Sequence, residues 1–243
     1  GSDLIKVMTG IRRAGKSVML ELIQAELLES GVSSNQFITI NFEDMRYANL
    51  LNAADLHTEI LRRADTIQGK AYLFFDEIQE VQGWEKCVNS LRVALDCDIY
   101  ITGSNAKLLS GELATYLGGR YVEFVIYPFS FAEFINLYRE TDASVSVQQS
   151  FQRYLLAGGM PYLSNIHFAA EPSRQYLFDL FNSVQLKDIV KRNGIRDVDL
   201  LERIIAYVMA NIGTTFSASS LVKFFKSERR SVSVAVSYTH LRA

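Results

Sequence analysis

Residues 10–17 read Gly10-Ile11-Arg12-Arg13-Ala14-Gly15-Lys16-Ser17, and this stretch decides how the chain folds. It fits the pattern G-x-x-x-x-G-K-[ST], in which glycines permit a tight loop whose backbone N–H groups face bound phosphates. Lys16 supplies a compact positive charge for the β- and γ-phosphates, and the Ser17 hydroxyl can bind magnesium. The alternative is a glycine-rich turn followed by an exposed lysine. We therefore expect a nucleotide to be bound by residues 10–17 together with Val18.

The segments on either side of the loop are those that the motif requires. Residues 4–9 are typical of a strand, and residues 16–29 carry apolar side chains at helical spacing before Gly31. A helix that begins at the loop adds the positive end of its dipole to the phosphate site.

Two acids follow a short apolar run at residues 71–75. In P-loop enzymes the first acid, here Asp76, holds magnesium, and a glutamate directly after it, here Glu77, can deprotonate the attacking water. Alone this pattern is weak, because many strands end in acids at a solvated turn. Together with the loop it is stronger, because the carboxyl ends of parallel strands meet in one crevice. The adjacent glutamate favours ATP hydrolysis over the chemistry of small GTPases or most kinases.

Three further polar residues are candidates for contact with the γ-phosphate. Ser104 and Asn105 follow a strand expected at residues 98–102, and either could sense the phosphate or the water. The alternative for Asn105 is a cap for a helix at residues 106–109. Arg120 could stabilise charge on the γ-phosphate, in cis or on a neighbouring subunit, or be an exposed residue beside a turn.

Strands and helices alternate over the first half of the chain, which predicts a parallel sheet covered by helices. After residue 128 the periodicity is helical as far as residue 225. We therefore expect an α/β ATP-binding domain at 1–135 and a helical region with a partial winged helix at 136–234. The remaining expected strands lie at residues 37–42 and 121–126, and the further helices at 53–64 and 84–95.

Composition limits the possible functions. The chain has 243 residues, 49% of them hydrophobic, and a net charge of -2 that does not draw it to nucleic acid or to an anionic membrane. No apolar run is long enough to span a bilayer. Cys87 and Cys97 fit no metal or redox spacing, and the three histidines form no ligand motif. We expect a reduced, cytoplasmic protein with no metal apart from nucleotide-bound Mg²⁺.

The predicted helix at 217–228 ends in a basic cluster formed by Lys223, Lys226, Arg229 and Arg230. Such a helix suits the second helix of a winged helix-turn-helix that contacts DNA phosphates. The alternative is a solvated helix end, where cations are favoured by the dipole.

Several stretches, taken in order, resemble one known family: residues 10–17, Phe75-Asp76-Glu77-Ile78-Gln79 with Trp84 downstream, Thr102-Gly103-Ser104-Asn105, Gly119-Arg120-Tyr121 and Tyr127-Pro128-Phe129-Ser130-Phe131. They look like the prokaryotic AAA-type ATPases that carry a C-terminal domain of unknown function with a winged helix. Gly158-Gly159-Met160-Pro161 resembles a further signature of that family.

The resemblance implies an additional-strand ATPase core with strand order 5-1-4-3-2. It also implies ATP and Mg²⁺ as ligands, a catalytic Glu77, phosphate contacts from Lys16, and magnesium ligands at Ser17 and Asp76. A sensor at Ser104 or Asn105 and an arginine finger at Arg120 are further implied roles. Members extend further at both ends, so we expect this chain to be a piece of a longer reading frame.

The last eight residues, 236–243, can be read back as GTC TCT TAT ACA CAT CTC CGA GCC. This resembles one frame of a transposon-end adapter used in sequencing libraries. We therefore expect residues 235–243 to be a non-native tail.

The sequence as a whole predicts ATP binding and Mg²⁺-dependent hydrolysis that drives or switches a conformational change. The alternative is a nucleotide-dependent regulator or DNA-binding protein with negligible turnover. The expected partners are ATP, a further copy of the chain through Arg120, an unknown protein client and, on weaker grounds, DNA.

Overall fold

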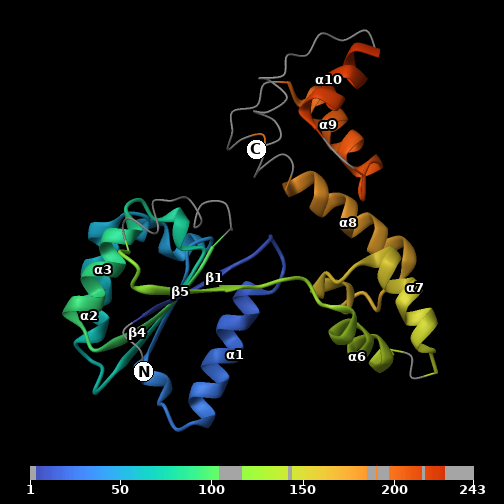
Figure 1. The fold of residues 1–243 in the computed structure, drawn as a ribbon. Coiled ribbons are helices and arrows are strands. Elements are labelled where there is room, and N and C mark those ends of the chain that lie inside the picture. Colours follow the sequence, from blue (N-terminus) through green and yellow to red (C-terminus); the bar gives the residue numbers. More distant parts are fainter. Residues whose placement is uncertain are drawn as a thin grey trace. The chain divides into compact units, whose positions relative to one another are not determined.

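Five parallel strands form a single sheet with the order β2-β3-β4-β1-β5 (Figure 1). Read from its other edge, this is the expected order 5-1-4-3-2, which is confirmed. The strands match the predicted segments to within a residue or so, because each is an apolar, β-branched or aromatic run bounded by polar residues. Their bounds are β1 Ile5–Thr9, β2 Phe37–Asn41, β3 Ala71–Asp76, β4 Cys97–Thr102 and β5 Tyr121–Val125.

The computed structural model describes residues 4–103, 117–141, 144–184, 190, 197–214 and 217–227. The chain divides into two compact units, Gly1–Ser173 and Arg174–Ala243. The first unit extends past the predicted domain boundary at residue 135, because the chain following the sheet packs back onto the α/β core. Within the described residues, no helix is both long enough and apolar enough to cross a membrane.

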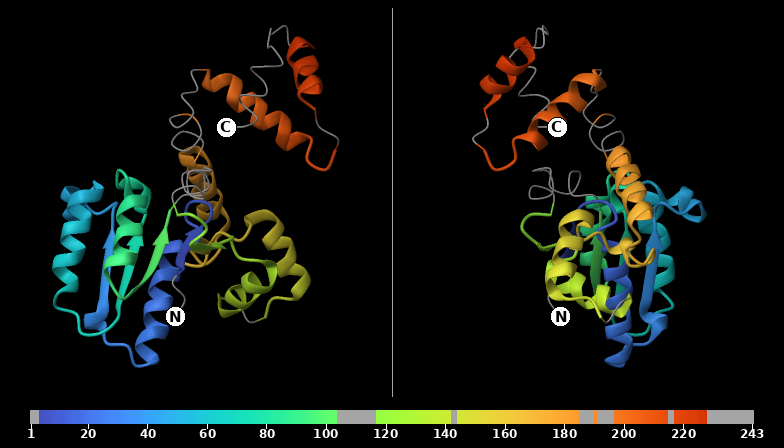
Figure 2. Two further views of the ribbon diagram at one scale, coloured as in Figure 1. Left: turned by 60° about the vertical axis from the view of Figure 1, so that its left-hand side comes forward. Right: turned by 90° about the vertical axis from the view of Figure 1, so that its right-hand side faces the viewer.

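Helices cover both faces of the sheet, α1 (Lys16–Glu29) on one and α2 (Ala53–Ala64) with α3 (Trp84–Ala94) on the other (Figure 2). The alternation of side chains along β3 builds the two cores. Phe74 is buried with Leu20 of α1, whereas Phe75 is buried in the cluster of α2 and α3. A strand buried on both faces is the expected environment for this wholly apolar run. Short 3-10 helices lie at Ser34–Gln36, Met45–Leu50 and Ile78–Glu80.

Three helical elements complete the first unit: α6 (Phe131–Thr141), α7 (Val147–Ala157) and a 3-10 turn at Pro161–Leu163. The ring of Phe134 in α6 is fully buried and lies 5.2 Å from the ring of Tyr154 in α7 and 4.9 Å from that of Phe168. Aromatic packing therefore fixes the chain that follows the sheet into one structure.

The second unit contains most of α8 (Ala170–Val184), and also α9 (Val198–Ala210) and α10 (Ala218–Ser227). α9 and α10 share a small core built from Leu200, Ile204, Leu221 and Phe225. The helical character predicted for this region is confirmed. The final residues of the expected winged helix and the expected tail fall in 228–243, outside the described residues.

Candidate functional site

The loop at residues 10–17 joins the carboxyl end of β1 to the first turn of α1. Gly10 has φ 145°, and a Cβ on it would overlap the backbone oxygen of Ile126, which follows β5. The Ile126 amide also donates a hydrogen bond of 2.7 Å to the Thr9 oxygen. Glycine is therefore required at position 10 both by the backbone angle and by close contact with a neighbouring segment.

Lys16 is buried, with 5% of its surface exposed, although it carries a charge. Its Nζ donates hydrogen bonds to the backbone oxygens of Gly10 at 3.2 Å and Ile11 at 3.1 Å. The side chain thus folds back across the loop. These contacts place the ammonium group at the point where the motif places phosphates.

The remaining loop residues take different positions around this lysine. Ala14 is buried, whereas Ile11, Arg13, Ser17 and Val18 are exposed. Arg13 has φ 62°, a conformation seldom adopted by residues other than glycine. Arg12 is partly buried, and its Nη2 lies 3.8 Å from Glu43 Oε1, in the segment after β2.

Asp76 is the last residue of β3, so it lies at the same carboxyl-terminal end of the strands as the loop, and it is 5% exposed. Asn41 Nδ2, at the end of β2, donates to its Oδ2 at 3.0 Å, and the Thr102 hydroxyl, at the end of β4, donates to its Oδ1. Both donors are neutral. The carboxyl group is therefore fixed from both neighbouring strands by side chains that carry no charge.

Glu77 has the left-handed backbone angles φ 53° and ψ 46°. Its amide donates a 3.1 Å hydrogen bond to the Thr102 hydroxyl, and its carboxylate accepts one from the Gln79 side chain. Burial raises the pKa of the Glu77 carboxyl above its ordinary value, while the Gln79 hydrogen bond and the Lys16 charge act in the opposite direction. A carboxyl with a raised pKa is a better proton acceptor than an exposed one.

The donor set fits a nucleotide-bound magnesium ion. Within the described part of the chain, Asn41 and Thr102 are the side chains seen to donate to Asp76, and both are neutral. Ser17, an exposed residue at the start of α1, carries a hydroxyl that can be a second ligand. Magnesium takes few protein ligands and keeps several waters, so one carboxylate and one hydroxyl beside a phosphate loop suffice.

Arg120 lies at the opposite, amino-terminal end of the strands. Its backbone oxygen accepts a 3.0 Å hydrogen bond from the Ile5 amide, at the start of β1, and its side chain is exposed. The five residues of β1 separate it from the loop, a rise of roughly 16 Å. Of the three possibilities considered for Arg120, this position argues against action in cis and leaves action on a neighbouring subunit or an exposed surface residue.

Three residues of the site were missed by the sequence reasoning: Gln79, which contacts Glu77, and Asn41 and Thr102. Asn41 and Thr102 are each the last residue of a strand next to β3. Their positions at strand ends, combined with the expected strand order, were a usable signal. Ser104 and Asn105, the predicted sensors, lie outside the described residues.

A different charge cluster lies near the amino-terminal ends of the strands. Asp98 is 8% exposed, and its carboxylate lies 2.8 Å from Lys6 Nζ and 3.2 Å from Lys70 Nζ. Lys6 Nζ also lies 5.1 Å from the centre of the Tyr100 ring. Here each charge is close to an opposite charge.

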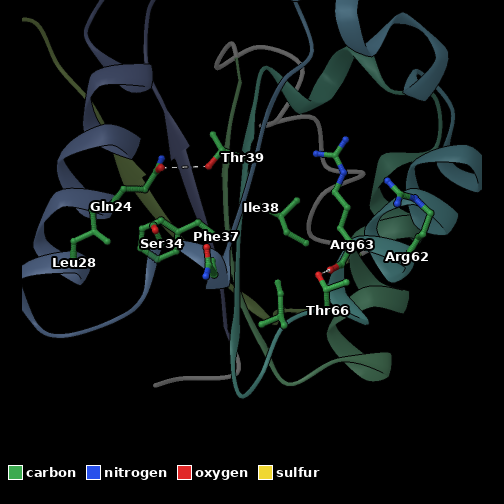
Figure 3. A pocket seen from close by; sticks show the side chains of 11 residues that line it. Gln24, Leu28, Ser34, Phe37, Ile38, Thr39, Arg62, Arg63 and Thr66 are labelled. Carbon is green, nitrogen blue, oxygen red and sulfur yellow. Dashed lines mark hydrogen bonds between the residues drawn. The ribbon is translucent and has the colours of Figure 1, made fainter.

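A groove of about 600 Å³ runs along the edge strand β2, between α1 and α2 (Figure 3). The Thr39 hydroxyl donates to Gln24 Oε1 at 3.3 Å across one side, and on the other Arg62 and Arg63 both pair with Glu59. None of the described residues that line the groove belongs to the phosphate loop or the acid pair. The groove is separate from the candidate site.

The cysteines are free and poorly placed for chemistry. Burial raises the pKa of Cys87 to about 12 and that of Cys97 to about 11, so both thiols stay protonated near neutral pH.

The sheet order and the loop together define a P-loop nucleotide-binding fold of the additional-strand class, because β4 lies between β1 and the acid-bearing β3. The family model AAA_14, described as an AAA domain, matches residues 2–135. The chain therefore belongs to the AAA_14 family. A second family model, for the domain of unknown function DUF8612, matches residues 148–239.

Two curated relatives share most of this chain. One, from Haemophilus influenzae, is named "Uncharacterized protein" and is 40% identical over 229 residues, which cover 94% of this chain and 56% of the relative. The other, Uncharacterized protein MJ1544 of Methanocaldococcus jannaschii, is 33% identical over 238 residues, covering 92% and 51%. The chain thus spans about half the length of the curated relatives it matches.

Solved structures that align with this chain include a mutant of Thermotoga maritima RuvB, with a TM-score of 0.48 and 13% identity, covering 98% of this chain and 80% of that chain. The Aeropyrum pernix ORC1 protein in complex with DNA has a TM-score of 0.41 and 10% identity, covering 98% and 76%. Both scores lie below 0.5, so the class of this chain rests on its own sheet order and family model.

Proposed function

We propose that this chain binds ATP with Mg²⁺ and hydrolyses it, and that the cycle drives or switches a conformational change in the protein. The observation that supports this most is that a lysine and an aspartate both lie at the carboxyl-terminal ends of the strands. The Lys16 ammonium donates to the backbone oxygens of Gly10 and Ile11, and the Asp76 carboxyl group accepts from the neutral donors of Asn41 and Thr102. Together they suit a magnesium–triphosphate, which carries both signs of charge.

In the proposed reaction the phosphate loop and Lys16 hold the β- and γ-phosphates in place. Asp76 and Ser17 would hold the magnesium ion, which neutralises developing charge on the phosphate oxygens when bound. Glu77 accepts a proton from a water molecule whose oxygen bonds to the γ-phosphorus. The bond from that phosphorus to the β,γ-bridging oxygen breaks, and ADP is the leaving group. Gln79, bound to Glu77, orients the carboxylate before the reaction.

Calorimetry with Lys16→Ala tests the proposal. ATP should bind to the wild-type chain in the presence of Mg²⁺, and its affinity should fall about a hundredfold or more in Lys16→Ala, because the phosphate cation is lost. Lys86→Ala, which removes an exposed lysine from α3, is the matched control and should bind like wild type. Equal affinity in all three proteins would refute the assignment. Binding without steady-state phosphate release would instead favour the nucleotide-dependent regulator.

We further propose that Arg120 acts in trans, on a nucleotide bound by a second copy of the chain. Its exposure at the amino-terminal ends of the strands supports this, since the phosphate loop of the same chain lies at their carboxyl-terminal ends. Arg120→Ala should slow turnover more than it weakens ATP binding. Mixing it with Lys16→Ala should restore part of the activity, because each protein supplies what the other lacks. Unchanged turnover in Arg120→Ala would leave it an ordinary surface residue.

An unknown protein client, and DNA contact through the basic cluster at α10, are further proposals. Lys223 is exposed on α10, while Arg229 and Arg230 of the basic cluster lie outside the described residues. Two free thiols with raised pKa values, one buried and one partly buried, suit a reducing compartment, and we propose that the protein acts in the cytoplasm.

A further inference from the structure

Arg12 and Glu43 form an ion pair that no step of the proposed reaction uses. Arg12 is the third residue of the phosphate loop, and Glu43 lies two residues after the end of β2. Nη2 of Arg12 is 3.8 Å from Oε1 of Glu43, and the two side chains are 32% and 60% exposed. An arginine of the loop is therefore held against the segment that follows β2.

The order of the strands shows what this ion pair crosses. The loop follows β1, Glu43 follows β2, and β3 and β4 lie between these two strands in the sheet. The pair therefore spans the carboxyl-terminal ends of β3 and β4, where Asp76 and Thr102 lie. In the proposed site, the magnesium ion and the γ-phosphate are needed at these ends. The Arg12 guanidinium thus lies on the γ-phosphate side of the loop.

Two further observations place Glu43 beside the acids of the site. Asn41 Oδ1 accepts a 2.9 Å hydrogen bond from the Glu43 amide, while Nδ2 of the same side chain donates to Asp76 at 3.0 Å. Burial is the main reason that the pKa of Glu77 is raised, and the charges of Asp76 and Glu43 raise it further. Arg12 is therefore paired with a carboxylate that lies close to both acids.

The chemistry of this pair favours its exchange for a phosphate. An ion pair with a 3.8 Å separation and a largely exposed carboxylate is weak. A γ-phosphate carries more negative charge than a carboxylate, and a planar guanidinium can bind two of its oxygens at once. Positive charge at these oxygens stabilises the transition state of phosphoryl transfer, and an arginine of the same chain can supply it.

We propose that Arg12 is a catalytic residue that acts in cis: when a nucleoside triphosphate binds, its guanidinium leaves Glu43 and contacts the γ-phosphate. Glu43 is a positioning residue, which holds the guanidinium beside the site as long as the γ-phosphate is absent. This inference rests on the proposed ATP site and adds a means by which that site distinguishes ATP from ADP.

Two nucleotides that differ in the γ-phosphate test the contact, by calorimetry with Mg²⁺ on the full chain. AMP-PNP carries a γ-phosphate and is not cleaved at the β,γ-bridge, whereas ADP has none. Arg12→Ala should weaken AMP-PNP about tenfold and leave ADP within about twofold of wild type, because only the γ-phosphate loses a partner. Arg46→Ala is the matched control and should change neither affinity, since Arg46 is an exposed arginine after β2 that pairs with Asp44.

Turnover gives a second readout of the same contact. Phosphate release by Arg12→Ala should fall about a hundredfold, and Arg12→Lys, which keeps the charge without the planar fork, should recover only part of it. Mixing Arg12→Ala with Lys16→Ala should restore no activity, because a second copy cannot supply a residue that acts in cis. The opposite result is expected for Arg120→Ala in the same mixture.

Glu43→Gln tests the holding role. It releases Arg12, so the affinity for AMP-PNP should rise about threefold relative to that for ADP. The loss of a nearby negative charge has the same effect by itself, so the substitution is repeated in the Arg12→Ala chain. A holding role predicts no rise there, whereas a simple effect of charge predicts the same rise in both chains.

The outcomes separate this inference from the nucleotide site itself. If Arg12→Ala weakens ADP and AMP-PNP equally, or weakens neither, Arg12 does not contact the γ-phosphate and the inference is wrong while the site stands. Activity restored by Lys16→Ala would overturn action in cis, and an equal rise for Glu43→Gln in both chains would overturn the holding role.

A variant that does not fold is recognised by its loss of ADP binding. Arg12→Lys then takes the place of Arg12→Ala: it should keep the affinity for ADP and lose affinity for AMP-PNP, and equal changes in the two affinities would overturn the contact. If wild type binds neither nucleotide, the proposed function fails and the role of Arg12 fails with it.

Discussion

The amino-terminal and carboxyl-terminal ends of the strands, here called the amino edge and the carboxyl edge of the sheet, carry the same kinds of charge but arrange them in opposite ways. At the amino edge, Asp98 lies between Lys6 and Lys70, with both Nζ atoms within 3.2 Å of its carboxylate oxygens. At the carboxyl edge, Asp76 is bound by the neutral donors of Asn41 and Thr102. Paired charges cancel, whereas a charge held by neutral groups keeps its field for a ligand. The amino edge is thus suited to stability and the carboxyl edge to binding.

Substitutions at either edge can test this difference. Changes at the carboxyl edge should alter nucleotide chemistry with little loss of stability. Changes at the amino edge should do the reverse.

The largest effect is expected for Glu77→Gln. The amide preserves shape but cannot accept a proton, so phosphate release should fall roughly 10²–10⁴-fold while ATP affinity stays near that of wild type. Stability should be unchanged or slightly higher, because burial opposes the charge of the carboxylate and a neutral amide is spared that cost. Phosphate release, calorimetry and thermal unfolding measure the three quantities.

Glu80→Gln is the matched control, since it makes the same change at an exposed glutamate in the same segment. Wild-type phosphate release by Glu77→Gln would show that another group accepts the proton.

A smaller effect is expected for Thr102→Val, which replaces the hydroxyl by a methyl group of similar size. The Thr102 hydroxyl serves both acids at once, donating to Asp76 and accepting from the Glu77 amide. Its loss leaves a buried carboxylate oxygen and a backbone amide without this partner, so kcat should fall about tenfold. Thr102→Ser keeps the hydroxyl and should retain most of the activity.

A structural role alone would predict a different pattern for Thr102. Hydrogen exchange of the Glu77 amide should be faster in Thr102→Val than in wild type or Thr102→Ser, because its acceptor is gone. If exchange is unchanged and Val and Ser behave alike, Thr102 does not position the acids.

The sequence was sufficient for the sheet, because every strand is a short apolar run and the loop motif marks which strand comes first. It also predicts Lys16, Asp76 and Glu77 as site residues, because their residue types follow from the chemistry of phosphate and magnesium, and these roles stay predictions. Asn41 was missed because a single polar residue at a strand end has no motif around it. Its role becomes visible once β2 is placed beside β3.

Glu43 and Arg120 show two different limits. The contact of Glu43 with Arg12 depends on the path of the chain after β2, and side-chain periodicity contains no information on that path. The position of Arg120 could have been inferred, since it precedes its strand whereas the acids and the loop follow theirs. In a parallel sheet, the residues that precede the strands lie at one end of the strands and the residues that follow them lie at the other end.

The smallest effect on function is expected at the amino edge, for Asp98→Asn. The substitution removes the charge that lies between Lys6 and Lys70 and leaves two cations facing a neutral amide. The carboxylate side chain is 10% exposed, so the loss should lie between that of a surface pair and a buried pair, about 1–2 kcal/mol of unfolding free energy. The midpoint of thermal unfolding should fall by a few degrees, and more at low salt than at high salt. ATP affinity should stay at the wild-type value, because the loop lies at the other end of β1. A drop in ATP affinity larger than the stability loss explains would show that the two edges are coupled, and the division of labour between them would then be wrong.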